Sequence, residues 1–106
     1  YKLLSTAQKE PIVISFYDDV LEYLRERDVD IQLQKIVYSL TNSKFEKCKE
    51  YNWDIDMDYE YVTSDIVKKV QKAGLKLNVW TVNNRNIARL LYKWGVNYIS
   101  TDNKFF

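Results

Sequence analysis

Apolar and polar residues alternate most regularly along residues 75–84, where every second position from 75 to 79 is apolar. A period of two residues, combined with β-branched and aromatic side chains, predicts a strand. Gly74 precedes this segment, at a point where a helix can end with positive φ. Asn83 and Asn84 follow it, and either side chain can cap the next helix. The segment therefore predicts a helix, a strand and a second helix in succession.

The same alternation of strand and helix patterns covers the rest of the chain. Strands are expected at 12–16, 31–40 and 96–101, and helices at 19–27, from Asn42 or Ser43 to 51, from Thr63 to 73, and at 85–94. Residues 53–61 fit a short strand or an extended loop, and residues 1–8 fit the end of a helix that began upstream. Strands that alternate with helices predict an α/β protein of parallel βα units joined by right-handed crossovers.

Composition indicates one small domain, and residues 1–106 contain no linker, so a single unit is expected. Sixteen basic and fifteen acidic residues give a net charge of +1, which predicts no nucleic-acid partner. Cys48 is the only cysteine, so no intrachain disulfide can form. Cysteine content therefore does not indicate whether the protein lies in an oxidising or a reducing compartment. The localisation of the whole protein is therefore left unknown, and this soluble segment is compatible with the cytoplasm or with membrane association through regions outside this sequence.

Acidic residues occupy alternate positions at Asp54, Asp56, Asp58 and Glu60. Carboxylate oxygens suit hard cations, but side chains on one face of a strand are spaced about 6.6 Å apart and no glycine-containing calcium loop is present. A solvated strand face is the favoured interpretation, and no metal ligands are predicted in this chain.

Two other reactive or charged features have structural explanations. Cys48 is expected to be an inert, inward-facing side chain, because no histidine is available to activate it. Lys68, Lys69 and Lys72 lie on one side of a predicted helix and are expected to form a solvated face.

Three segments carry a resemblance to a known family. Val-Trp-Thr-Val-Asn at 79–83, followed by Trp-Gly-Val-Asn-Tyr-Ile-Ser-Thr-Asp at 94–102, resembles the C-terminal end of glycerophosphodiester phosphodiesterases. Members of that family end in a WTVN strand, a helix and a GVDxIxTDxP strand. Ile-Ser-Phe at 14–16 resembles the family's SF strand. Lys104 departs from the pattern, because the family has proline at that position.

The resemblance implies that the parallel βα units form the C-terminal (βα)4 half of a TIM-barrel-like phosphodiesterase fold. Half a barrel has two unpaired sheet edges and an inner face with nothing across from it. The missing N-terminal half is then expected on the same polypeptide, although a second chain could supply it or the sheet could flatten and dimerise. We favour the first arrangement.

The resemblance also implies the hydrolysis of glycerophosphodiesters to glycerol 3-phosphate and an alcohol. Family members use a divalent cation, calcium or magnesium, to neutralise the phosphate, and two histidines as general acid and base. These groups belong to the family's N-terminal motifs HRG, ExD and HD, and HRG and HD cannot occur here because the sequence contains no histidine. No catalytic residue, metal ligand or cofactor is therefore expected in this chain, which should be inactive alone.

Substrate binding is the family role that the resemblance assigns to residues of this chain, namely Trp80 and Phe16. Trp80 matches the family tryptophan that lines the substrate cleft, and Phe16 lies at the end of the SF strand. By resemblance, each gives the glycerol moiety an apolar wall, because the C-terminal ends of barrel strands face the active site. The competing interpretation makes both rings ordinary core aromatics. Asn83 is interpreted as a helix cap and Asp102 as structural.

Two other classes of function stay open. The first is a non-catalytic half-barrel module used for self-association or regulation. The second is a ligand-binding α/β domain, which has weaker support because no glycine-rich phosphate loop follows a strand.

Overall fold

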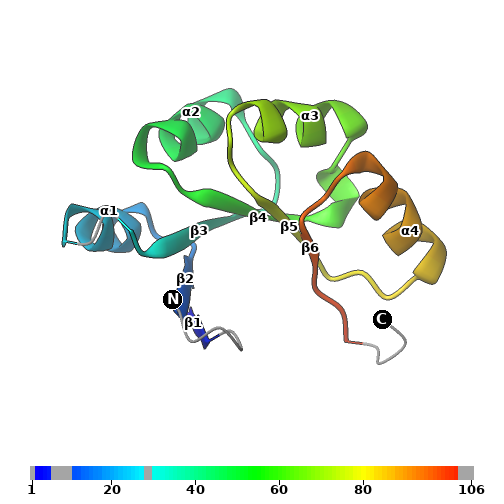
Figure 1. The fold of residues 1–106 in the computed structure, drawn as a ribbon, viewed down its shortest axis with the longest axis horizontal. Coiled ribbons are helices and arrows are strands. Elements are labelled where there is room, and N and C mark those ends of the chain that lie inside the picture. Colours follow the sequence, from blue (N-terminus) through cyan, green and yellow to red (C-terminus); the bar gives the residue numbers. More distant parts are fainter. Residues whose placement is uncertain (1, 6–10, 28–29, 103–106) are drawn as a thin grey trace.

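The computed structural model describes residues 2–5, 11–27 and 30–102 (Figure 1). Its six strands are β1 (Lys2–Ser5), β2 (Pro11–Ser15), β3 (Gln32–Val37), β4 (Asp54–Asp58), β5 (Leu77–Trp80) and β6 (Tyr98–Ile99). The helices are α1 (Asp18–Arg27), α2 (Asn42–Tyr51), α3 (Ser64–Lys72) and α4 (Arg85–Trp94), with a 3-10 turn at Tyr59–Tyr61. In this described part of the chain, no helix has the length and apolar character needed to cross a membrane.

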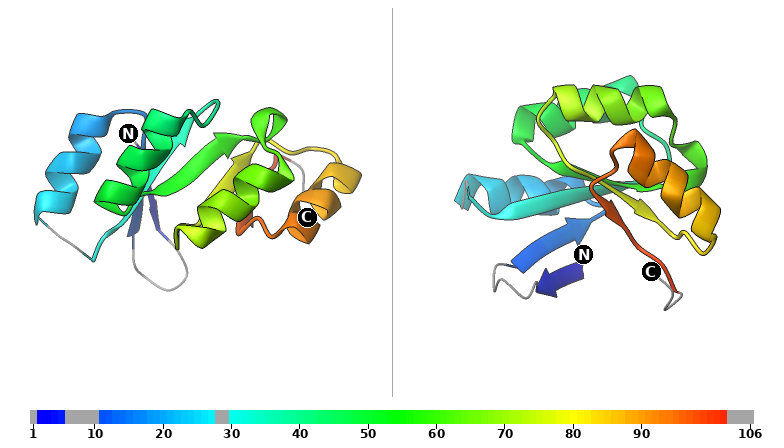
Figure 2. Two further views of the ribbon diagram at one scale, coloured as in Figure 1. Left: turned by 90° about the horizontal axis from the view of Figure 1, so that it is seen from above. Right: turned by 45° about the vertical axis from the view of Figure 1, so that its right-hand side comes forward.

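Strands β2 to β6 are parallel, and they neighbour one another in the order in which they occur in the sequence. A right-handed crossover between parallel strands places its helix on a fixed side of the sheet, and an order without reversal keeps every helix on that side. Figures 1 and 2 show α1 to α4 together on one face of the sheet. The prediction of parallel βα units is confirmed.

The hydrophobic core lies between the sheet and these helices. Its strand residues occupy odd-numbered positions and include Val13, Leu33, Val37, Ile55, Met57, Leu77 and Val79. Its helix residues include Leu21, Phe45, Cys48, Val67, Val70, Ala88 and Leu91. Because side chains alternate across a strand, the even-numbered strand positions face away from the helices.

Helix ends follow local rules, with one correction. Thr63 caps α3 by accepting a hydrogen bond from the Ile66 backbone N–H, as predicted, and Gly74 follows that helix with a φ of 76°. The cap of α2 is Thr41 rather than Asn42 or Ser43. Thr41 has extended backbone and accepts from the Lys44 N–H, the geometry that a cap requires.

The predicted helix at residues 1–8 is wrong for Lys2–Ser5, which form β1, and residues 1 and 6–8 lie outside the described residues. Strand β1 pairs antiparallel with β2, from Lys2 opposite Ile14 to Ser5 opposite Pro11. An edge strand offers unpaired backbone groups, and pairing with them overrides a weak helical pattern. The sheet of the described residues therefore still has two unpaired edges, but they belong to β1 and β6 and not to β2.

The ambiguous segment 53–61 contains β4, which lies between β3 and β5. The prediction of a solvated acidic face is wrong for Asp56, which is only 6% exposed. Asp56 lies opposite Ile36 on β3 and Asn78 on β5, in the middle of the sheet. Strand pairing on both sides removes the water that an edge strand would keep.

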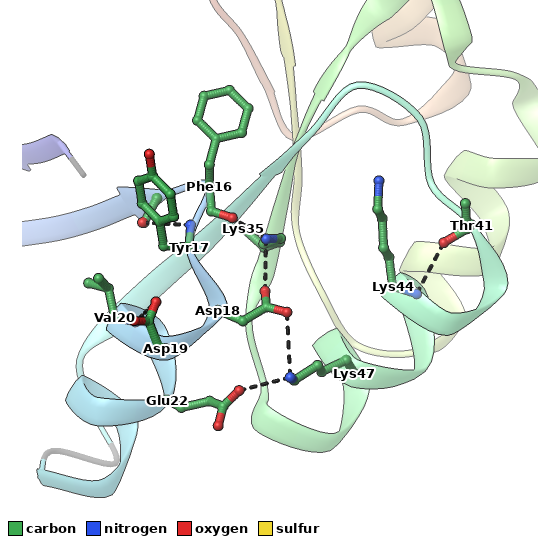
Figure 3. Close-up of polar contacts among 11 residues, drawn as sticks. Phe16, Tyr17, Asp18, Asp19, Val20, Glu22, Lys35, Thr41, Lys44 and Lys47 are labelled. Atoms are coloured by element: carbon green, nitrogen blue, oxygen red, sulfur yellow. Dashed lines mark hydrogen bonds and ion pairs between the residues drawn. The ribbon is translucent and has the colours of Figure 1, made fainter.

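A network of charges joins the turn between β2 and α1 to β3 and α2 (Figure 3). Lys35 Nζ lies 2.8 Å from one Asp18 carboxylate oxygen, and Lys47 Nζ lies 3.4 Å from the other. Lys47 Nζ also lies 2.8 Å from Glu22 Oε2. Burial raises the pKa of Asp18, but the hydrogen bonds and charges of the two lysines outweigh it and hold the pKa below its usual value.

We predict that Asp18→Asn destabilises the fold near neutral pH by about 1 kcal/mol or less, because the carboxylate is 39% exposed. A pKa that is lowered by folding stabilises the protein above the unfolded value and loses this effect as the pH falls through the folded value. The difference in unfolding free energy between wild type and variant should therefore disappear below about pH 4. Urea unfolding at several pH values measures it.

Asp19→Asn is the matched control, because Asp19 lies in the same helical turn but is exposed and forms no salt bridge within the described residues. An equal loss of stability in both variants would assign the effect to the helix dipole instead of the lysines.

Candidate functional site

A hollow of about 500 Å³ opens at the carboxyl ends of the parallel strands. Its lining residues come from or directly follow β2, β3, β5 and β6, and they are Phe16, Ile36, Tyr38, Trp80, Thr81, Ser100, Thr101 and Asp102. Carboxyl ends of parallel strands meet at one edge of a sheet, which explains how residues far apart in the sequence line one hollow.

The structure brings Phe16 and Trp80 to this hollow, with Tyr38 between them. The Phe16 and Tyr38 rings stack with centroids 5.9 Å apart, and the Tyr38 and Trp80 rings meet edge to face at 5.7 Å. Phe16 is 46% exposed and Trp80 is half-buried, and the core of the described residues contains neither. The rings are therefore not the ordinary core aromatics of the competing interpretation.

Tyr38 is a lining residue that the sequence analysis missed. Tyr38 directly follows β3, just as Phe16 directly follows β2, and Tyr38 is 59% exposed. Tyr38 is an aromatic residue near the end of the strand predicted at 31–40, but no family motif marks it as the motifs mark Phe16 and Trp80.

The backbone of Phe16 is held by the charge network below it. Lys35 Nζ donates a hydrogen bond to the Phe16 carbonyl oxygen while it pairs with Asp18. The next residue, Tyr17, donates its backbone N–H to Ser15 Oγ at 2.9 Å. Figure 3 shows the Phe16 ring pointing away from these ion pairs, so the network fixes the turn and leaves the ring free to line the hollow.

Asparagine side chains form hydrogen bonds with the polar residues that line the hollow. Asn83 Oδ1 accepts from Thr101 Oγ1 and from the Asp102 backbone N–H, both at 3.0 Å. Ser100 Oγ donates to Asn78 Oδ1 at 3.3 Å. The interpretation of Asn83 as a helix cap is wrong, because Asn84 caps α4. Asn83 instead connects the segments that follow β5 and β6.

The described residues do not offer the groups that phosphodiester hydrolysis requires. Within ranges 2–5, 11–27 and 30–102, no group of three or more His, Cys, Asp or Glu side chains could hold a metal ion. The residues present therefore do not fit a divalent cation. Cys48 is buried, and burial raises the pKa of its thiol to about 12, so the thiol stays protonated near neutral pH. The hollow can bind a ligand, and its described lining combines aromatic rings and hydroxyl groups with one carboxylate, that of Asp102.

The fold resembles those of solved phosphodiesterases. An Oleispira antarctica phosphodiesterase, solved in complex with the product sn-glycerol-3-phosphate, is 17% identical and has a TM-score of 0.81. The match covers 92% of this chain and 40% of that chain. A glycerophosphodiester phosphodiesterase from Parabacteroides distasonis is 25% identical with a TM-score of 0.71, over 84% of this chain and 37% of that chain. None of the curated protein sequences is significantly similar to this chain.

This chain therefore spans well under half the length of these solved structures. The predicted fold class, parallel βα units that form part of a TIM-barrel-like phosphodiesterase fold, is confirmed. The family model described as "Glycerophosphoryl diester phosphodiesterase family" matches residues 1–104. The family match thus supports the resemblance of the terminal motifs and extends it to almost the whole sequence. The chain belongs to the glycerophosphoryl diester phosphodiesterase family.

Proposed function

We propose that residues 1–106 form one unit, the C-terminal part of an enzyme that hydrolyses glycerophosphodiesters to glycerol 3-phosphate and an alcohol. In this proposal the chain supplies walls of the substrate cleft through Trp80 and Phe16. The observation that carries the proposal is that these two residues, predicted separately, line one hollow at the carboxyl ends of the strands.

The chemistry of these side chains suits binding and orientation. Phenylalanine and tryptophan rings have no group that exchanges protons near neutral pH, so they pack against the C–H surface of a ligand and exclude water. Thr81, Ser100 and Thr101 add hydroxyl oxygens to the lining of the hollow. The catalytic histidines and the ligands of a calcium or magnesium ion belong, in this proposal, to an N-terminal half of the barrel. The product bound to the Oleispira antarctica protein supports a small-molecule substrate.

One observation favours the alternative, a non-catalytic half-barrel module for self-association or regulation. Strand β1 pairs with β2 at the edge where a preceding parallel strand of a barrel would lie. A sheet that covers the edge of β2 with its own strand has less need of a second half beside β2. In the enzyme proposal, the N-terminal half takes the place of β1 beside β2.

We predict that Trp80→Ala raises the KM for a glycerophosphodiester about tenfold in the natural-length protein, because loss of a ring contact removes roughly 1–2 kcal/mol of binding. Steady-state kinetics with glycerophosphocholine measure KM and kcat, and circular dichroism checks the fold. Tyr92→Ala is the control, since Tyr92 is an exposed ring on α4, away from the hollow. Equal KM and kcat for wild type and Trp80→Ala would show that the Trp80 ring packs within the protein and does not contact the substrate.

A second prediction concerns the missing half. The natural-length protein should hydrolyse glycerophosphodiesters and should lose this activity in a chelator of divalent cations, whereas residues 1–106 alone should show no turnover. Release of glycerol 3-phosphate, measured with a coupled dehydrogenase, gives the readout. Hydrolysis by residues 1–106 alone would contradict the proposal, and an inactive natural-length protein would favour the module.

A further inference from the structure

A second hollow, of about 600 Å³, lies between α2 and α3 on the helical side of the sheet. Its lining includes Phe45 and Lys49 from α2, and Asp65, Lys68, Lys69 and Lys72 from α3. The cleft described above involves none of these residues. What this hollow binds is therefore independent of the proposed function.

The hollow carries an excess of positive charge, with four lysines and one carboxylate in its lining. Lys49 forms an ion pair with Glu46 at 3.3 Å. In the part of the chain that the structure describes, Lys68, Lys69 and Lys72 form no salt bridge. Like charges that outnumber the counter-charges around them repel one another, and an anion in the hollow would relieve this repulsion.

Two of the ammonium groups converge on one ring. Lys69 Nζ lies 4.4 Å from the centroid of the buried Phe45 ring, and Lys49 Nζ lies 5.2 Å from the same centroid. The ring attracts both cations through its π face but leaves their charge and N–H donors available. Since the two lysines come from different helices, the tertiary fold rather than one helical pattern brings them together.

The helix dipole explains only part of this arrangement. Lys49, Lys69 and Lys72 lie in the last turns of their helices, where a positive charge is favourable. That effect acts on each helix separately and accounts neither for Lys68, which comes just before the last turn of α3, nor for the convergence on Phe45. The prediction of a solvated face on α3 alone also left out Lys49.

We propose that this hollow binds a phosphomonoester anion, either free or as the headgroup of a lipid. Such a group carries about −1.5 to −2 charge near neutral pH and has three strong acceptor oxygens, which matches several lysine donors at close quarters. The buried ring of Phe45 also lines the hollow, and the Asp65 carboxylate in the lining opposes anion binding, so several lysines must contact the anion together.

Thermal unfolding of the natural-length protein tests the proposal without any assay of catalysis. Ligands that bind only the folded state raise Tm, so inorganic phosphate should raise Tm saturably, and sodium chloride at the same ionic strength should not. The double variant Lys49→Gln and Lys69→Gln should weaken the apparent affinity at least about tenfold. Lys93→Gln, which removes an exposed lysine of α4, should behave as wild type.

Vesicle sedimentation identifies the source of the phosphate. Binding to phosphatidylcholine vesicles that contain phosphatidic acid, and not to phosphatidylcholine alone, would assign a lipid headgroup, whereas a response to inorganic phosphate without vesicle binding would assign a free ligand. The proposal is overturned if phosphate and phosphatidic acid both have no effect, if chloride acts equally, or if the double variant binds as tightly as wild type.

Discussion

The order of the parallel strands is the constraint on which the rest of this structure depends. Five strands follow one another without reversal, and right-handed crossovers then place every helix on one face. The apolar side chains must therefore gather on that face, where they form the core. The same order brings all carboxyl ends to one edge, so Phe16, Tyr38 and Trp80 meet although they are distant in the sequence.

The face without helices has a different character. Gln34, Asp56 and Asn78 are buried there at even-numbered strand positions, among the residues that a complete barrel would enclose. Gln34 Oε1 has no hydrogen-bond partner within the described residues. A buried acceptor without a donor costs free energy. Under the proposed function, the facing half of the barrel supplies that donor, and the polar row becomes part of the barrel interior.

Local patterns predicted the elements whose causes are local. Alternation at 75–84 predicted β5, and Thr63 and Gly74 predicted the ends of α3, because caps and periodicity act within a few residues. The central position of β4 could not be predicted, since acidic residues are rare in buried strands and only pairing with β3 and β5 places Asp56 inside.

Long-range contacts explain the other differences. Strand β1 is stabilised by its pairing with β2, and Asn83 accepts a hydrogen bond from Asp102, a residue that follows α4 in the sequence. Arg25 is a further example, because its guanidinium donates to the carbonyl oxygens of Tyr51, Asn52 and Ile31, a set that no sequence pattern indicates. In the candidate site, the family motifs supplied Trp80 and Phe16, whereas Tyr38 and the asparagine contacts required the tertiary fold.

A crystal structure of the natural-length protein with sn-glycerol 3-phosphate would test the central claim most directly. The account predicts that further parallel strands continue the sheet beyond β6, and that the glycerol carbons lie within about 4 Å of the Trp80 and Phe16 rings. A sheet that ends at β6, with the product bound away from both rings, would contradict it.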